Sequence, residues 1–300
     1  MVPNPGRVDP IPWRRSNVVP VVAAGVGFVL LFGPPFLSLL NGWWSDPEAA
    51  HGLLLGPLAV WFAWRRGLID ESEAVPRPVL GLIILMGAVA LRYASGLAAE
   101  LFTMRVSMLV ALVAIVVAAR GLRQLRAWWL PAALLVFSVP LPAVVTGTIA
   151  LPLQLEASRM GAALLEWRQV PVLLSGNVIH IPGRTLFVTE ACSGLRSLSS
   201  LLALGVLQGG LWLRIPAVRV LLLVVTLPVA MAVNGVRVFL TGFLVFFVAP
   251  EFGEGFMHYT EGWLLFLFSF GILGAVTWAL VWAESRFGSP FLRPPRRHGT

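Results

Sequence analysis

The chain holds a single cysteine, Cys192, within the stretch EACSGLRS at residues 190–197. Arg196 follows four residues later, so in a helix it shares a face with the cysteine, and a nearby cation stabilises the reactive thiolate. Glu190, two residues before the cysteine, acts in the opposite direction unless an arginine neutralises it. The pattern makes Cys192 a candidate nucleophile for covalent catalysis.

Two other stretches carry residues that can assist such a nucleophile. NGVRVF places Asn234 and Arg237 three residues apart, on one face of a helix. An arginine at the bilayer centre costs roughly 2.5–3.5 kcal/mol, so Arg237 is a functional candidate. HYTEGW contains His258, a side chain suited to moving protons near neutral pH, and Glu261 can fix its tautomer.

Each of these residues also has a purely structural interpretation. A lone cysteine in a membrane helix usually packs as a small apolar side chain. Arg196 and Arg237 can extend from helix ends to the membrane surface, and His258 can be an ordinary loop histidine. Their predicted placement at three helix ends on one side of the membrane favours a shared site.

The composition defines the class of protein. The chain is 58% hydrophobic and 12% charged, with a mean hydropathy of +0.85, which is typical of a polytopic membrane protein. All 22 basic residues are arginines scattered between apolar stretches, so we expect no nucleic-acid partner. One cysteine excludes an internal disulfide, and four dispersed histidines predict no metal site. No cofactor is predicted.

The apolar segments predict an all-α polytopic fold with about eight transmembrane helices, because a span needs about 20 apolar residues. The second segment is short, and the seventh is either continuous or broken near Asn234–Gly235. The predicted spans are 17–40, 51–64, 79–97, 103–119, 127–148, 193–212, 217–237 and 263–283.

The arginines predict the orientation, since cytoplasmic loops are enriched in them. Fifteen of the 22 fall on one side, which places both termini in the cytoplasm. We therefore divide the chain into a cytoplasmic tail (1–16), one membrane domain (17–283) and a basic cytoplasmic tail (284–300). The fifteen are Arg7, Arg14, Arg15, Arg65, Arg66, Arg77, Arg120, Arg123, Arg126, Arg214, Arg219, Arg286, Arg293, Arg296 and Arg297.

The longest stretch between spans, 149–191, is predicted to be extracytoplasmic. Its first part opens with Pro152 and predicts an amphipathic helix on the membrane surface. Its second part has short β-prone runs separated by Ser175-Gly176-Asn177 and Pro182-Gly183, which predict a β-hairpin or three-stranded flap. The flap leads into Cys192, at the outer end of the sixth span.

These stretches together resemble the exosortase/archaeosortase family of membrane transpeptidases. The resemblance rests on EACSGLRS, NGVRV and HYTEGW in that order, and on WWSDPEAAHGLLLGPLAVWFAWRR, PLPAVVTGTIALPLQLEAS and GNVIHIPGRTLFVTEACSG. It covers most of residues 40–283, and CSG-x-R is its most specific element. The first 16 residues, the arginine-proline tail and Tyr259 depart from the family pattern.

The resemblance implies a Cys–Arg–His active site made of Cys192, Arg237 and His258. The spacing described above adds Arg196, Glu190, Asn234 and Glu261 as supporting residues. It implies a multi-pass protein of a bacterial or archaeal cytoplasmic membrane, with the site facing the periplasm or exterior. The implied substrates are secreted proteins with a PEP-CTERM-like tail of motif, hydrophobic helix and basic cluster. The implied reaction cleaves the tail through an acyl-enzyme and passes the protein to an acceptor.

Two alternatives remain open at the level of sequence. An intramembrane cysteine protease would use the same chemistry with water as the acceptor. A non-catalytic transporter or exopolysaccharide-assembly subunit would use polar residues to line a pathway. A transporter or assembly subunit would be expected to have ionisable residues spread through the bilayer, whereas here they cluster at the outer ends of the predicted spans.

Overall fold

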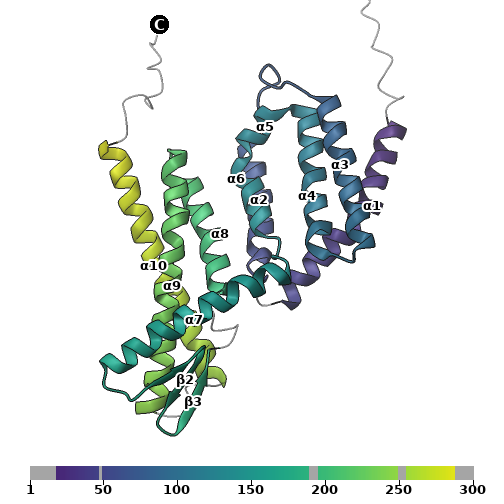
Figure 1. Ribbon diagram of the computed structural model, residues 1–300. Coiled ribbons are helices and arrows are strands. Elements are labelled where there is room, and N and C mark those ends of the chain that lie inside the picture. The colour runs from purple at the N-terminus through teal and green to yellow at the C-terminus, as the bar shows by residue number, and fades with distance from the viewer. Residues whose placement is uncertain (1–17, 47–48, 189–194, 249–254, 288–300) are drawn as a thin grey trace, which may run out of the picture.

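The structure, a computed structural model, describes residues 18–46, 49–188, 195–248 and 255–287. Helices α1–α6 form one group and α8–α10 a second, while α7 runs obliquely across their ends towards a small sheet (Figure 1). The helices are α1 (Val18–Ser45), α2 (Gly52–Arg66), α3 (Pro78–Leu97), α4 (Leu101–Arg120), α5 (Leu122–Ala127), α6 (Trp129–Phe137), α7 (Ala143–Trp167), α8 (Leu195–Trp212), α9 (Pro216–Phe247) and α10 (Gly255–Phe287). The strands are β1 (Leu173–Ser175), β2 (Val178–Ile181) and β3 (Arg184–Phe187).

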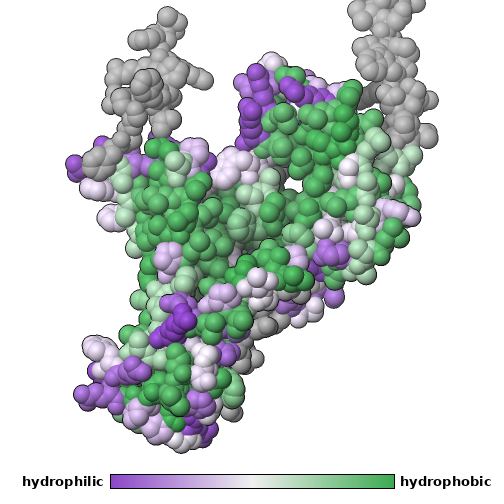
Figure 2. All heavy atoms as spheres, in the orientation of Figure 1, coloured by the Kyte–Doolittle hydropathy of each residue, from purple (hydrophilic) through white to green (hydrophobic). Residues whose placement is uncertain are grey.

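The two polar ends of the molecule are separated by an apolar belt. The beginning of α1 and the end of α10 lie on the side opposite the sheet (Figure 1), and Figure 2 shows mostly hydrophobic side chains between hydrophilic ends. Within the described residues, five helical segments are long and apolar enough to cross a membrane. They are Val22–Ser45, Pro78–Leu97, Leu101–Arg120, Pro216–Phe247 and Leu264–Arg286.

One predicted span is not a single helix. The segment 127–148 divides into α6, which ends at Phe137, and the beginning of α7 at Ala143. Pro140 and Pro142 account for the break, because proline has no N–H to donate and restricts the residue before it. Helix α2, with 15 residues, is shorter than a typical span. The total of eight crossings therefore stays a prediction.

The possible break in the seventh span is absent. Helix α9 runs without interruption from Pro216 to Phe247, through Asn234 and Gly235. Its 32 residues make it about 48 Å long at 1.5 Å per residue, well beyond the roughly 30 Å of a bilayer core. The C-terminal end of this long helix lies beside the sheet (Figure 1).

The predicted flap is confirmed as a three-stranded antiparallel sheet in the order β1-β2-β3. Ser175 pairs with Val178 across a two-residue turn, in which Gly176 has a φ of 62°. Ile181 pairs with Arg184 across Pro182 and Gly183, and Gly183 has a φ of 77°. A proline followed by a glycine with positive φ is the combination that a type II turn requires.

Close contacts between α7 and α9 hold the sheet side of the molecule together. A Cβ atom on Gly161 would lie 2.5 Å from Val238 Cγ1, one on Gly235 would lie 2.7 Å from Met160 Cβ, and one on Gly242 would lie 2.8 Å from Leu165 Cδ1. The backbones can approach this closely because glycine has no side chain. Beside these contacts, the sheet packs on both helices in one apolar cluster made of Ala157, Leu165, Val170, Ile179, Ile181, Val188, Val238 and Val245.

A second set of contacts joins α1, α2 and α6. Trp43 packs against Gly52 and Gly56, where any larger residue would overlap its ring. Its Nε1 donates a hydrogen bond of 2.7 Å to the carbonyl of Ser138, just after the end of α6. His51 Nε2 lies 3.0 Å from the carbonyl of Phe137, the last residue of α6. Both bonds satisfy carbonyls that a helix end leaves without an intrahelical partner.

The two groups of helices meet through one apolar cluster. It joins Leu55 and Ala59 of α2 and Leu130 and Leu134 of α6 to α8, which contributes Ala203 and Val206. The middle of α8 is thereby held against the first group of helices, which matters because α8 follows the segment that contains Cys192.

Replacing Gly161 with alanine tests the α7–α9 packing. Overpacking a tight contact costs about 1–3 kcal/mol, which outweighs the roughly 1 kcal/mol that alanine gains over glycine in a helix. We expect Gly161→Ala to lower the midpoint of thermal unfolding in detergent. Gly147→Ala, in the same helix with no atom within 4 Å of the added Cβ, is the matched control and should not lower it. Equal midpoints for the two variants would contradict the close packing.

Candidate functional site

Helix α9 carries the two candidate residues whose surroundings are described. Asn234 is buried, with 5% of its surface exposed. Arg237 is half-buried, and its Nε atom is fully buried. Thr241, one turn further on, donates from its hydroxyl to the carbonyl of Arg237 at 3.1 Å. The spacing predicted from the sequence is confirmed, because α9 is helical throughout this region.

The depth of Arg237 along α9 explains how a guanidinium is accommodated there. It lies 21 residues beyond Pro216, the first residue of the helix, which corresponds to about 32 Å. If the hydrocarbon core begins near Pro216, its thickness of about 30 Å ends just before this arginine. On that placement Arg237 would lie at the edge of the hydrocarbon core, where a charge costs less than at the centre.

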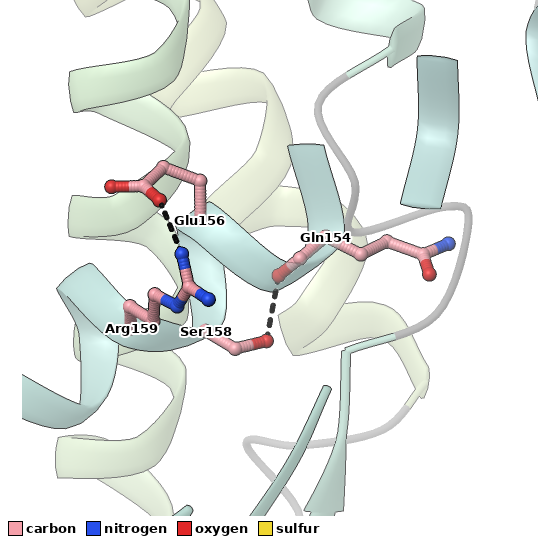
Figure 3. A network of polar contacts seen from close by, with 4 residues as sticks. All are labelled: Gln154, Glu156, Ser158 and Arg159. Carbon is pink, nitrogen blue, oxygen red and sulfur yellow. Dashed lines mark hydrogen bonds and ion pairs between the residues drawn. The ribbon is translucent and has the colours of Figure 1, made fainter. Parts of the chain in front are cut away.

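A groove adjoins these residues, between α7, α8 and α9. Five of its lining side chains are apolar, and two, Glu156 and Asn234, are polar. Glu156 pairs with the exposed Arg159 at 3.3 Å, one turn along α7 (Figure 3). The groove is open at one side and is lined by Leu153, Glu156, Ala157, Leu198, Ala230, Met231 and Asn234.

The beginning of α8 connects the groove with the predicted nucleophile. Cys192 and Glu190 lie outside the described residues, in the segment 189–194 between the sheet and α8. Helix α8 begins at Leu195, three residues after Cys192, and Leu198 lines the groove. Arg196 belongs to the first turn of α8, and its side chain is not described. The cysteine therefore precedes a helix whose first turns border the groove.

The predicted histidine belongs to the first turn of α10. This helix begins at Gly255, so His258 and Glu261 both lie within its first two turns, although their side chains are not described. Helix α10 packs against α8 and α9. It begins on the sheet side and runs antiparallel to α9 (Figure 1). The elements that carry the thiol, the guanidinium and the imidazole thus gather on the sheet side.

The structure therefore places Asn234 in one groove with Leu198 of the first turn of α8, while the meeting of Cys192, Arg237 and His258 stays a prediction. Sequence reasoning missed the contribution of α7, whose residues 153–157 form one wall of the groove. The signal available was the polar pair Gln154 and Glu156 within a run of leucines. That pattern is equally typical of a helix with one face in solvent, so it did not identify a site.

These features define a membrane protein built from several apolar helices, with a sheet and a groove gathered at one side. Residues 43–275 match the family described as transmembrane exosortase. This match spans more than half of the 300-residue chain, so the protein belongs to the transmembrane exosortase family and is a multi-pass membrane protein. No curated protein and no solved structure matches the chain.

Proposed function

We propose that the protein is a membrane-embedded cysteine transpeptidase that removes the C-terminal sorting tail of secreted proteins and transfers the remaining protein to an acceptor. The family match carries the proposal, because it spans Cys192, Arg237 and His258 in the order that the resemblance requires. The gathering of α8, α9 and α10 on the sheet side supports it, since the three residues belong to or directly precede these helices.

The proposed reaction proceeds in two steps. The proton of the Cys192 thiol passes to His258, and the thiolate attacks the carbonyl carbon of the scissile peptide. Arg237 stabilises the negative charge that develops on the carbonyl oxygen. The C–N bond breaks, the leaving amine takes the proton from His258, and a thioester remains on Cys192.

The second step regenerates the enzyme. His258 accepts a proton from the incoming nucleophile, which attacks the thioester, and the Cys192 thiolate leaves. In this scheme Glu261 orients His258, while Arg196 stabilises the thiolate and neutralises Glu190. Asn234 lines the groove beside Arg237 and contacts the substrate peptide there. The acceptor is an amine or hydroxyl in transfer and water in hydrolysis.

The proposed orientation places the sheet outside the cytoplasmic membrane, in the periplasm or exterior, and both termini in the cytoplasm. The arginine-rich loops on the side opposite the sheet support it. Helix α7 then lies at the outer membrane surface, where its exposed apolar residues Val144, Leu151 and Trp167 contact lipid. The tail's hydrophobic helix lies in the bilayer, and an edge strand of the sheet can pair with the extended recognition motif.

Removal of the thiol tests the nucleophile. In a host that expresses a tailed substrate, Cys192→Ala should lower tail cleavage by at least about 1,000-fold, since removal of a nucleophile costs more than most single changes. Immunoblotting of the tagged substrate before and after cleavage measures the rate. Processing at the wild-type rate would exclude Cys192. A new amide or ester at the cleaved end identifies transfer, and a free carboxylate identifies hydrolysis.

Substitution of Arg237 by lysine separates charge from geometry. Lysine keeps the positive charge but loses the planar fork of donors, so we expect Arg237→Lys to cut the cleavage rate by about 100-fold. Arg159→Lys, at an exposed arginine beside the groove, is the matched control and should keep a rate close to wild type. A wild-type rate for Arg237→Lys would remove this guanidinium from the mechanism.

The orientation can be measured with single cysteines introduced into a Cys192→Ala background. Ser175→Cys, at the end of β1, and Ser72→Cys, in the loop between α2 and α3, both change exposed serines. A membrane-impermeant maleimide added to intact spheroplasts should label only Ser175→Cys, and cell lysis should expose Ser72→Cys. The opposite pattern of labelling would reverse the proposed orientation.

A further inference from the structure

The outer edge of β3 carries backbone groups that the sheet itself does not use. The N–H of Val188 donates to the carbonyl of Asn177 at 3.0 Å, so these two residues form a hydrogen-bonded pair that continues the β2–β3 ladder. Hydrogen-bonded and non-hydrogen-bonded pairs alternate along an antiparallel ladder. The N–H and C=O groups of Thr185 and Phe187 therefore point away from β2, towards the outer edge.

No other described segment pairs with these four groups. Within the described part of the chain, neither Thr185 nor Phe187 makes a backbone hydrogen bond outside the sheet. Both residues are exposed, and 66% of the surface of Phe187 is accessible. An unpaired strand edge is a template for a further strand, and proteins usually protect it with proline, charges or a covering element. Here the edge has no proline, and its one charged residue, Arg184, lies at its beginning.

The opposite edge of the sheet, formed by β1, is shorter and closer to the helices. Strand β1 has three residues, and the same alternation leaves only the backbone groups of Leu174 directed outward. This strand packs against α7, and the side chain of Leu174 belongs to the apolar cluster that joins the sheet to the helices. Strand β3 therefore offers the larger free edge.

Strand β3 also lies against the helix that carries the candidate guanidinium. Cδ1 of Leu186 lies 3.4 Å from the position that a Cβ atom on Gly242 would occupy. Gly242 follows Arg237 by five residues, which corresponds to about 7.5 Å along the axis of α9. The free edge is thus part of the same side of the molecule as the candidate site.

We propose that the outer edge of β3 binds the extended recognition motif of the tailed substrate as a fourth strand, through the backbone N–H and C=O groups of Thr185 and Phe187. The inference rests on the proposed function, which supplies the occupant, and it assigns the strand and the atoms that bind it. In the proposed orientation, the hydrophobic helix of the tail holds the motif at the membrane surface on the sheet side. Main-chain hydrogen bonds supply the affinity in this mode of recognition.

Disulfide cross-linking tests the geometry without any cleavage. In full-length protein with Cys192→Ala, Thr185→Cys is combined with a tailed substrate that has one cysteine at successive motif positions. The residue opposite Thr185 in an added strand lies about 5.5 Å away between Cα atoms, within the range of a disulfide. The yield should therefore be highest at one position, weaker two residues away and lowest between them.

Ser175→Cys in the same background is the matched control. Ser175 is exposed on β1, two strands from β3 and therefore about 14 Å from an added strand, so it should give no cross-link. Equal yields at all motif positions, or the same pattern from Ser175→Cys, would overturn the inference. Homodimers linked through Thr185→Cys in place of the substrate complex would also overturn it, because the edge would then pair with a second copy of the chain.

Proline at position 185 tests the backbone bond. Thr185→Pro removes an N–H that β2 does not use, and proline is tolerated on an edge strand whose N–H faces outward. Thr185→Val removes the same hydroxyl but keeps the N–H. With purified full-length protein that retains Cys192, KM for the tailed substrate should be about 10-fold higher for Thr185→Pro than for Thr185→Val, with nearly equal kcat.

Equal KM values for these two variants would contradict the proposed pairing, and so would a difference confined to kcat. Failure of the proposed function is a separate outcome. Equal tail cleavage by the wild type and Cys192→Ala would remove the proposed chemistry, whereas the cross-linking pattern in the Cys192→Ala background reports on binding alone.

Discussion

The close approach of α7 to α9 is the constraint on which the sheet side of the molecule depends. Helices in lipid gain nothing from hydrophobic burial against each other, so van der Waals packing at small residues has to hold them together. Gly161, Gly235 and Gly242 provide that packing at three successive levels, each against a side chain of the other helix. The contacts fix which face of α9 is turned towards α7. Asn234 therefore enters the groove, and Arg237 remains beside it. The sheet is fixed by the same contacts, because its apolar side chains pack on both helices.

Local signals allowed several features to be predicted from the sequence. The turns of the sheet were identified because glycine and proline restrict the backbone over two or three residues, as at Gly176 and Pro182-Gly183. The family was identified from short motifs in a fixed order, and the match over residues 43–275 confirms it. The apolar run 127–148 does not reveal the boundary between α6 and α7, because its length suits a span although Pro140 and Pro142 interrupt the helix. The two prolines, rather than the mean hydropathy of the run, determine where the helix ends.

The groove could not be predicted, because it exists only where three elements meet. Leu153, Leu198 and Asn234 are far apart in the chain, and none has a neighbour in sequence that indicates a shared cavity. Gln154 presents the same difficulty. Among leucines it is typical of the polar face of a surface helix, whereas in the structure it is buried. Periodicity shows that a helix has two faces, but the identity of the covered face depends on the tertiary packing.

For the proposed function, the lengths of the helices bear on a conflict that peptide cleavage in a membrane would face. Charged groups and an acceptor nucleophile are needed at the reaction centre, whereas the hydrocarbon core excludes both. Helices α9 and α10, with 32 and 33 residues, are each longer than the core requires, by roughly 18 Å at 1.5 Å per residue. Arg237 lies in the half of α9 nearer the sheet, and His258 lies in the first turn of α10, which begins on that side (Figure 1). There α7 and the sheet cover the last turns of α9 with protein, so water is limited without the cost of full burial in lipid. Electrostatic stabilisation is stronger in such surroundings than in bulk water. A tail held in the bilayer by its own hydrophobic helix would present its cleavage site at the same level.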